Sequence, residues 1–170
     1  MGKTVNELIE FILENHHKFM RRILPELDAG FRQVLSQPET KTAKGGASEI
    51  FESIQGPYRS LSAEIQHHLF KEEQILFPSI EGIAKGEKGG MCGHIGGPIN
   101  QMIFEHENAK KELDEIKAGV EKARGNGNAG KLSKEAEKLA ENLLLMRSDL
   151  IAHIKIEEEE LFPAAIEMCN

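Results

Sequence analysis

The sequence predicts an all-α protein folded as an antiparallel four-helix bundle. Apolar residues recur every three or four positions along most of the chain, as on the buried stripe of a helix. No segment shows the sustained alternation of apolar and polar residues that is typical of a strand. Three connections divide the helical pattern into four long stretches, which is the arrangement of a helix bundle.

The first helix is expected from about Thr4 to Leu35. Thr4 followed by Glu7 has the pattern of a capping box, and apolar residues then follow at helical spacing. Pro25 lies inside this pattern, and we expect it to kink the helix rather than end it. The next segment, from Ser36 to Gly46, contains a proline and two glycines and is interpreted as a connection.

The second helical stretch occupies about Ser48 to Ala84. Gly56-Pro57 is expected to break it into a short piece and a long one that begins near Pro57. The segment that follows, from Lys85 to Gly97, is too rich in glycine to be helical.

Pro98 is well placed to open the third helix, which runs to about Arg124. A second break covers Gly125 to Gly130, and the fourth helix is expected from about Lys131 to Met168. Two Phe-Pro steps, Phe77-Pro78 and Phe162-Pro163, are expected to pack and bend helices at one end of the bundle.

Length and composition fit a single domain over residues 1–170. The net charge of −7 argues against a protein that binds nucleic acid or an anionic membrane, because both partners require a basic face. No apolar run approaches the roughly 20 residues that a membrane span requires. The N-terminus also lacks a signal pattern. We therefore expect a cytoplasmic protein.

Cys92 and Cys169 have neither metal-ligand spacing nor the pattern of a disulfide framework, which fits a reducing cytosol. Cys92 and His94 lie in the glycine-rich loop, where we favour ordinary loop residues. The alternative is that they line the mouth of a site or supply an extra ligand.

Two pairs of histidine and glutamate stand out because both fall on apolar stripes. His68 and Glu72 are four residues apart, as are His153 and Glu157, so each pair shares one face of a helix. His106 lies on the stripe of the third helix, and at least one of His16 and His17 faces inward on the first. His67 falls on the opposite side of its helix and is expected to be exposed.

A buried, ionised glutamate is costly unless a positive charge neutralises it. No lysine or arginine lies consistently on these faces, so ion pairing does not explain the two carboxylates. Two metal ions do explain them, because imidazole suits iron and two carboxylates can bridge a pair of metals. Open coordination positions would then remain for a small ligand such as oxygen, nitric oxide or peroxide.

A single H-x-x-x-E pair is common on helix surfaces, and a lone histidine on an apolar face is usually a core residue. Here the pair occurs twice with the same flanks, because His68 and His153 each begin the pattern H-x-x-x-E-E-x-x-L-F-P. This repeat predicts two related halves of one bundle and favours the metal site over ordinary core histidines.

The chain resembles the hemerythrin-like (HHE cation-binding) family, and most closely its branch of di-iron proteins called repair of iron centres. Four motifs carry the resemblance: H-x-x-x-x-x-x-L-P-E-L from His17, H-x-x-x-E-E-Q-I-L-F-P from His68, G-P-I-x-x-M-x-x-E-H ending at His106, and H-I-x-x-E-x-x-x-L-F-P from His153. The resemblance implies a hemerythrin-like bundle with two iron ions per chain, joined by an oxo or hydroxo bridge when oxidised. It also selects His17 over His16. The implied ligands are His17, His68, Glu72, His106, His153 and Glu157.

Two departures from the family disfavour a pure oxygen carrier. Oxygen-carrying hemerythrins use H-x-x-x-H on the third helix, where this chain has Lys110 four residues after His106. They end with H-x-x-x-x-D, where this chain has His153 and Glu157. The repair branch often carries an N-terminal cysteine-containing domain; we expect this chain to be the bundle alone, without the partner contacts or redox chemistry of that domain.

The resemblance implies repair of iron–sulfur clusters damaged by nitric oxide or oxidants, through iron donation or reduction of nitric oxide. Damaged iron–sulfur proteins would then be partners. A module that reversibly binds oxygen or nitric oxide, for sensing or storage, is the alternative, and peroxidase-like or ferroxidase activity also fits an open di-iron site. A bundle without metal is the remaining possibility.

Neighbouring polar residues receive simpler interpretations. Glu73 and Glu158 are expected to face water. Glu160 is a candidate for the second layer around the metal, where it would contact a ligand and not the metal itself. Tyr58 is a weak candidate for a redox or hydrogen-bonding role, and packing in the core is favoured.

Overall fold

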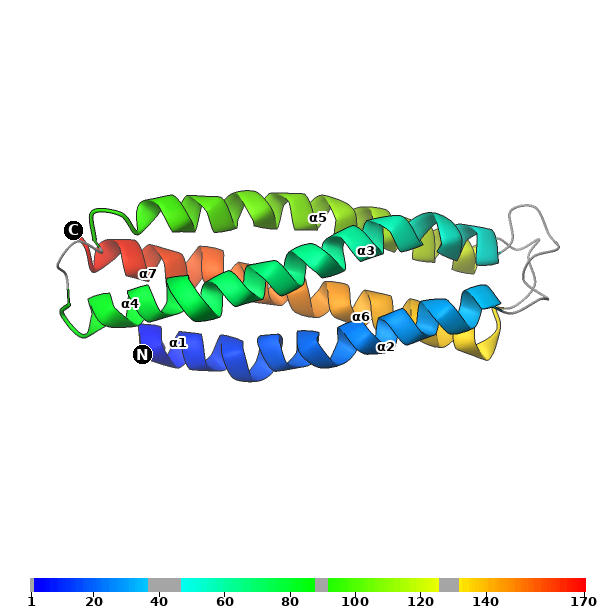
Figure 1. Ribbon diagram of the computed structural model, residues 1–170, viewed down its shortest axis with the longest axis horizontal. Helices are drawn as coiled ribbons and strands as arrows, with labels where there is room; N and C mark the ends of the chain where they lie inside the picture. The colour runs from blue at the N-terminus through cyan, green and yellow to red at the C-terminus, as the bar shows by residue number, and fades with distance from the viewer. Residues whose placement is uncertain (1, 37–46, 88–91, 126–131) are drawn as a thin grey trace. The chain divides into compact units, whose positions relative to one another are not determined.

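A computed structural model describes residues 2–36, 47–87, 92–125 and 132–170, and within these ranges every regular element is helical and none is a strand. The prediction of an all-α bundle is confirmed. Successive segments join end to end into four helical runs (Figure 1). Their bounds are α1 Val5–Phe11, η1 Ile12–His17, α2 Lys18–Ser36, α3 Ala47–Lys71, η3 Glu72–Leu76, α4 Phe77–Ala84, α5 Gly96–Gly125, α6 Lys134–Ile156, η4 Glu157–Leu161 and α7 Phe162–Glu167.

The chain divides into two compact units, each built from four helical segments. The first unit comprises Met1–Phe19, Glu64–Ala109 and Leu150–Asn170, and the second comprises Met20–Ala63 and Lys110–Asp149. No helix in the described part of the chain is both long and apolar enough to cross a membrane.

The first unit has an apolar core at the end that contains the N-terminus of α1 and the whole of α4 and α7. Thr4 caps α1 as predicted. Its hydroxyl accepts a hydrogen bond from the backbone N–H of Glu7, and the Glu7 carboxylate accepts one from the backbone N–H of Thr4. The buried members of this core are Leu8, Ile9, Ile12, Leu76, Phe77, Ile80, Ile83, Ile95, Ile99, Met102, Leu161, Phe162 and Ala165.

In the second unit, Tyr58 is a core residue, as favoured by the sequence. Its hydroxyl donates to the carbonyl oxygen of Leu24 (2.9 Å) and lies 3.0 Å from a carboxylate oxygen of Asp28. Its ring stacks on Phe31, with 4.9 Å between ring centroids. Burial raises the pKa of the phenol, and the neighbouring Asp28 raises it further. Tyr58 therefore stays protonated and fixes the packing of two helices.

The predicted break at Gly56-Pro57 is wrong, because α3 runs without interruption from Ala47 to Lys71. A proline in a helix normally collides with the Cβ of the residue before it, and Gly56 has no Cβ. The apolar stripe also continues across the proline through the buried residues Ile54 and Leu61. Likewise α2 continues through Pro25, as predicted.

Other predicted boundaries differ little or lie outside the described residues. The third helix begins at Gly96 rather than Pro98, and the fourth begins at Lys134. Most of the predicted connections, at 37–46 and 126–130, fall outside the described ranges, as do the predicted helix start at Lys131 and residues 88–91 of the glycine-rich loop.

Three of the helical runs contain a wider, π-helical turn, which the sequence analysis did not predict. At each turn a backbone N–H bonds the carbonyl five residues earlier: Lys18 to Leu13, Phe77 to Glu72, and Phe162 to Glu157. A proline is the second residue after the second turn and after the third, and a proline supplies no N–H to continue regular helical bonding. Such π-turns are frequent at functional sites, because they shift side chains relative to a regular helix.

Candidate metal centre

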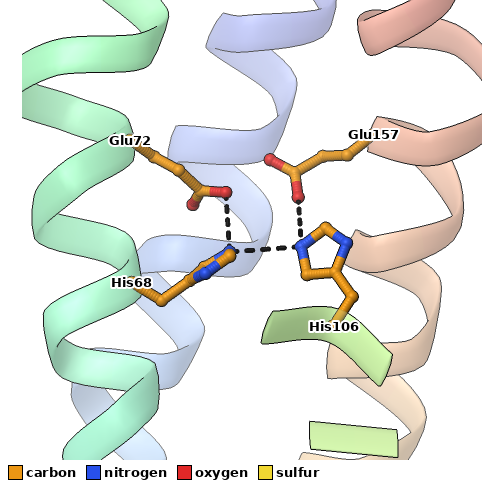
Figure 2. A group of neighbouring side chains, drawn as sticks. All are labelled: His68, Glu72, His106 and Glu157. Carbon is orange, nitrogen blue, oxygen red and sulfur yellow. Dashed lines mark hydrogen bonds and ion pairs between the residues drawn. The ribbon is translucent and has the colours of Figure 1, made fainter. Parts of the chain in front are cut away.

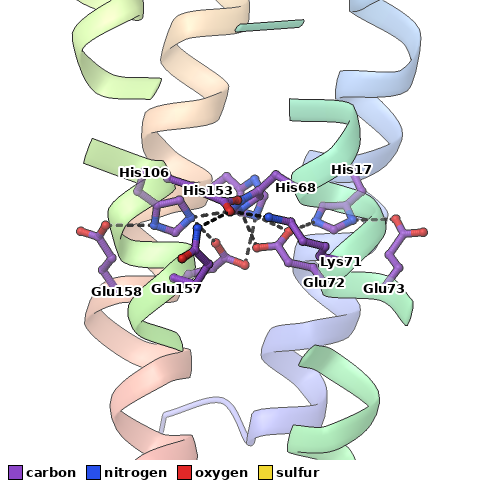
Figure 3. Close-up of polar contacts among 11 residues, drawn as sticks. His17, His68, Lys71, Glu72, Glu73, His106, His153, Glu157 and Glu158 are labelled. Carbon is purple, nitrogen blue, oxygen red and sulfur yellow. Dashed lines mark hydrogen bonds and ion pairs between the residues drawn. The ribbon is translucent and has the colours of Figure 1, made fainter. Parts of the chain in front are cut away.

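The structure brings all six predicted ligands together inside the first unit (Figure 3). They come from four helical runs, and each is buried, with at most 8% of its surface exposed. Three of them lie at the π-turns: His17 ends η1, Glu72 opens η3 and Glu157 opens η4.

The first candidate metal position is formed by His68, Glu72, His106 and Glu157, whose potential ligand atoms all lie within 4.8 Å of one another (Figure 2). His68 Nε2 lies 2.8 Å from Glu72 Oε1, and His106 Nε2 lies 3.2 Å from Glu157 Oε2. The Nε2 atoms of the two histidines are 3.2 Å apart. Both imidazoles therefore direct the same nitrogen into one small space.

The second candidate metal position is formed by His17, Glu72 and His153, whose potential ligand atoms also lie within 4.8 Å of one another. His17 Nε2 lies 3.2 Å and His153 Nε2 lies 3.9 Å from Glu72 Oε2. Glu157 adds its Oε1 atom, 3.2 Å from His153 Nε2.

Each of the two glutamates divides its oxygens between the two positions. Glu72 directs Oε1 to His68 and Oε2 to His17. Glu157 directs Oε2 to His106 and Oε1 to His153. Carboxylates placed in this way would bridge a pair of metal ions if two were bound.

Unsatisfied polar atoms test whether metal ions fit this site. Among the described residues, both carboxylate oxygens of Glu72 and Glu157 and the Nε2 atoms of His17 and His153 are buried without a hydrogen-bond partner. Burying such atoms unpaired costs on the order of 1–3 kcal/mol each, and more for a charged group. Imidazole and carboxylate donors that converge in this way suit iron and similar metals, so the residues fit a pair of cations.

The acid–base properties of the metal-free centre are set by its carboxylates. Burial opposes ionisation of Glu72, but the positive charge of His68 and the imidazoles of His17 and His68 beside its oxygens outweigh burial and hold the Glu72 pKa well below its usual range. Burial lowers the pKa of His68, but Glu72, Glu157 and Glu105 outweigh it and raise this pKa to about 9. His68 is therefore protonated at neutral pH when no metal is bound.

We expect metal uptake by the metal-free protein to release protons near pH 7, because a metal binds only the neutral imidazole of His68. With the His68 pKa at about 9, the release should be large at pH 7 and should decline above pH 9, where the proton has already left. Titration with a divalent metal in weak buffer containing an indicator dye measures it. Equal release at pH 7 and pH 10 would contradict the raised pKa.

Three further carboxylates hold the outer nitrogens of three histidines. The Nδ1 atoms of His17, His68 and His106 lie 2.7, 2.9 and 2.9 Å from carboxylate oxygens of Glu73, Glu105 and Glu158. Figure 3 shows Glu73 beside His17 and Glu158 beside His106. An Nδ1–H that donates to a carboxylate leaves the Nε2 lone pair for the metal and makes the imidazole a stronger ligand. The carboxylates therefore fix the orientation of three histidines.

The expectation that Glu73 and Glu158 face water is wrong, because each is partly buried against a histidine of another helical run. Glu160, a candidate from the sequence for the second layer around the metal, is exposed. Glu105 was not predicted, although it directly precedes His106. Its carboxylate oxygens accept hydrogen bonds from Lys71 and from Gln101 (2.9 Å). Burial opposes ionisation of Glu105, but these two bonds and the one from His68 outweigh burial and lower the Glu105 pKa to about 2.

His16 is buried, and it belongs to neither metal position. Its ring stacks on the ring of His153, with centroids 5.5 Å apart and planes 11° apart. The structure thus brings His17, and not His16, to the cluster. His67 is exposed, as predicted, and His94 is exposed too.

Cys92 and Cys169 form a disulfide, and the expectation of unpaired cysteines is wrong. Their sequence separation of 77 residues gives no pattern by which to pair them. The fold brings the loop before α5 to the end of α7, where both residues pack against the apolar core of the first unit. A disulfide sulfur is not a metal ligand, so Cys92 supplies none.

Comparisons with known proteins agree with the geometry. The family model of the hemerythrin HHE cation binding domain matches residues 8–165. Proteins named iron-sulfur cluster repair protein YtfE from Yersinia pseudotuberculosis and Yersinia pestis are 29% identical to this chain over 167 residues, which cover 96% of this chain and 67% of theirs. The protein of that name from an Enterobacter species is 29% identical over 163 residues, with the same coverage.

Proposed function

Because the chain belongs to the hemerythrin HHE cation-binding family, we propose that it is a non-haem di-iron protein that helps repair iron–sulfur clusters damaged by nitrosative or oxidative stress. The observation that carries the proposal is the pair of buried positions bridged by Glu72 and Glu157. Relatives that cover almost all of this chain are named for iron–sulfur cluster repair, which supports the repair role.

The charges around the centre support bound cations. Among the described residues, the fully buried carboxylates of Glu72 and Glu157 lie between the two positions, and Glu73, Glu105 and Glu158 place further carboxylates against the histidines. The six residues that would hold the ions are His17, His68, Glu72, His106, His153 and Glu157. A bound ferrous pair would supply electrons and open coordination positions for nitric oxide, oxygen or peroxide.

The protein itself orients the ligands and excludes water. Phe77 packs on the ring of His17 and Phe162 on that of His106, with ring centroids 5.7 and 6.1 Å apart. Both phenylalanines come from the repeated L-F-P sequence, so the repeat supplies an apolar wall on each side. Glu105, held by Lys71, is partly exposed and offers a route by which protons can pass between solvent and His68.

We further propose that residues 1–170 form one domain, which the extent of the family match from residue 8 to 165 supports. The proposed location is the cytoplasm, and the proposed partners are damaged iron–sulfur proteins and the diatomic gases. In a reducing compartment the disulfide between Cys92 and Cys169 would be open and would close only under oxidising stress.

The test is to purify the protein without chelators, measure bound metals, and record ferrous spectra before and after adding nitric oxide and oxygen. We expect about two irons per chain, as the paired positions require. Transfer of iron to a damaged cluster, or release of nitrous oxide, would support repair. A stable, reversible oxygen adduct without either activity would favour the alternative, a gas-binding module. A protein that binds no metal would refute both.

A further inference from the structure

The centre has an approximate internal symmetry that follows the sequence repeat. Glu72 and Glu157 correspond, as do His68 and His153, and His17 corresponds to His106. The correspondence extends outward, because Glu73 holds Nδ1 of His17 as Glu158 holds Nδ1 of His106. In both halves the second glutamate of the E-E pair holds a histidine of another helical run.

The symmetry fails around His153. Glu105 precedes His106 and holds Nδ1 of His68 at 2.9 Å. The corresponding residue, which precedes His17, is His16, and its ring stacks on His153. Nδ1 of His153 is buried and has no hydrogen-bond partner among the described residues. A histidine thus occupies the place at which the other half has a carboxylate.

The presence of His16 in place of a carboxylate weakens His153 as a ligand. A carboxylate on the outer nitrogen fixes the tautomer of an imidazole and increases its basicity, and losing such a partner typically costs about 10–100-fold in metal affinity. The stacked ring of His16 supplies no such charge.

We propose that the two metal positions hold their ions unequally, and that His16 makes the position formed by His17 and His153 the one that releases its ion. The inference rests on the proposed di-iron function, and it identifies which of the two irons is available for transfer. The ion at the His68–His106 position stays, because both of its histidines have carboxylate partners.

The test is a chelator chase of the iron-loaded full-length protein without oxygen. An excess of a colour-forming ferrous chelator should remove one iron per chain fast and the other about 10–100-fold more slowly. His16→Glu places a carboxylate beside His153, as Glu105 lies beside His68, and should slow the fast phase until the two phases merge. Glu105→Gln removes the carboxylate from Nδ1 of His68 and should therefore make the slow phase faster.

His16→Gln is a second variant in case the buried carboxylate of His16→Glu impairs folding. Its amide oxygen can accept from Nδ1 of His153, so a smaller slowing of the fast phase is expected. Two irons that leave wild type at one rate, or a fast phase that neither His16 variant changes, would overturn this inference and leave the di-iron proposal intact. A protein that never loads iron would instead refute the proposed function.

Discussion

Replacing Glu72 and Glu157 together by glutamine is expected to reduce bound iron from about two ions per chain to none. Each carboxylate contributes an oxygen to both positions, so the double change removes a negative ligand from each and the charge that offsets the cations. Metal analysis of the purified variant, with circular dichroism to establish that it is folded, measures this effect. Glu160→Gln is the matched control, because Glu160 is exposed on the same turn as Glu157.

The same variant should lose the stabilisation that metal gives to wild type. Without metal, the double change removes two desolvation costs but also the contacts of Glu72 with His17 and His68, so each metal-free protein serves as the baseline for its own metal response. With iron present at about 100 times its dissociation constant, wild type gains about 2.7 kcal/mol per site, and the variant gains nothing. Thermal unfolding of both proteins, with and without ferrous iron, separates the cases. Equal metal responses would refute a role for these glutamates as ligands.

The fold and the six clustered residues were predictable because both depend on patterns local in sequence. Apolar spacing predicts the helices, and the repeated H-x-x-x-E-E-x-x-L-F-P places His68 with Glu72 and His153 with Glu157 on buried faces. The choice between His16 and His17 could not come from spacing, because both are buried in the structure. The motif resemblance resolved it.

The residues that were missed depend on contacts between distant segments. Glu73 and Glu158 follow the bridging glutamates and would face solvent on an isolated helix, but histidines 56 and 52 residues away in sequence lie against them. The repeat did carry a signal, because the second glutamate occurs in both copies. The pairing of Cys92 with Cys169 is likewise set by the packing of the first unit and has no local signature.

Reduction of the disulfide between Cys92 and Cys169 is expected to cost about 2–4 kcal/mol of unfolding free energy. The bond closes a loop of 77 residues, and opening it returns that conformational entropy to the unfolded chain. For a chain of this size, the loss corresponds to a fall in melting temperature of about 4–16 °C. Neither cysteine belongs to a metal position, so bound iron should remain at wild-type levels in the folded, reduced protein.

Thermal unfolding with and without a phosphine reductant measures the effect. The variant in which both cysteines are serine should melt at the temperature of reduced wild type and should not respond to the reductant. Serine preserves the size of each side chain, so this control separates loss of the bond from loss of packing against the apolar core of the first unit. If thiol titration of protein purified without reductant finds two free thiols, and the reductant leaves the melting temperature unchanged, the bond does not stabilise the protein.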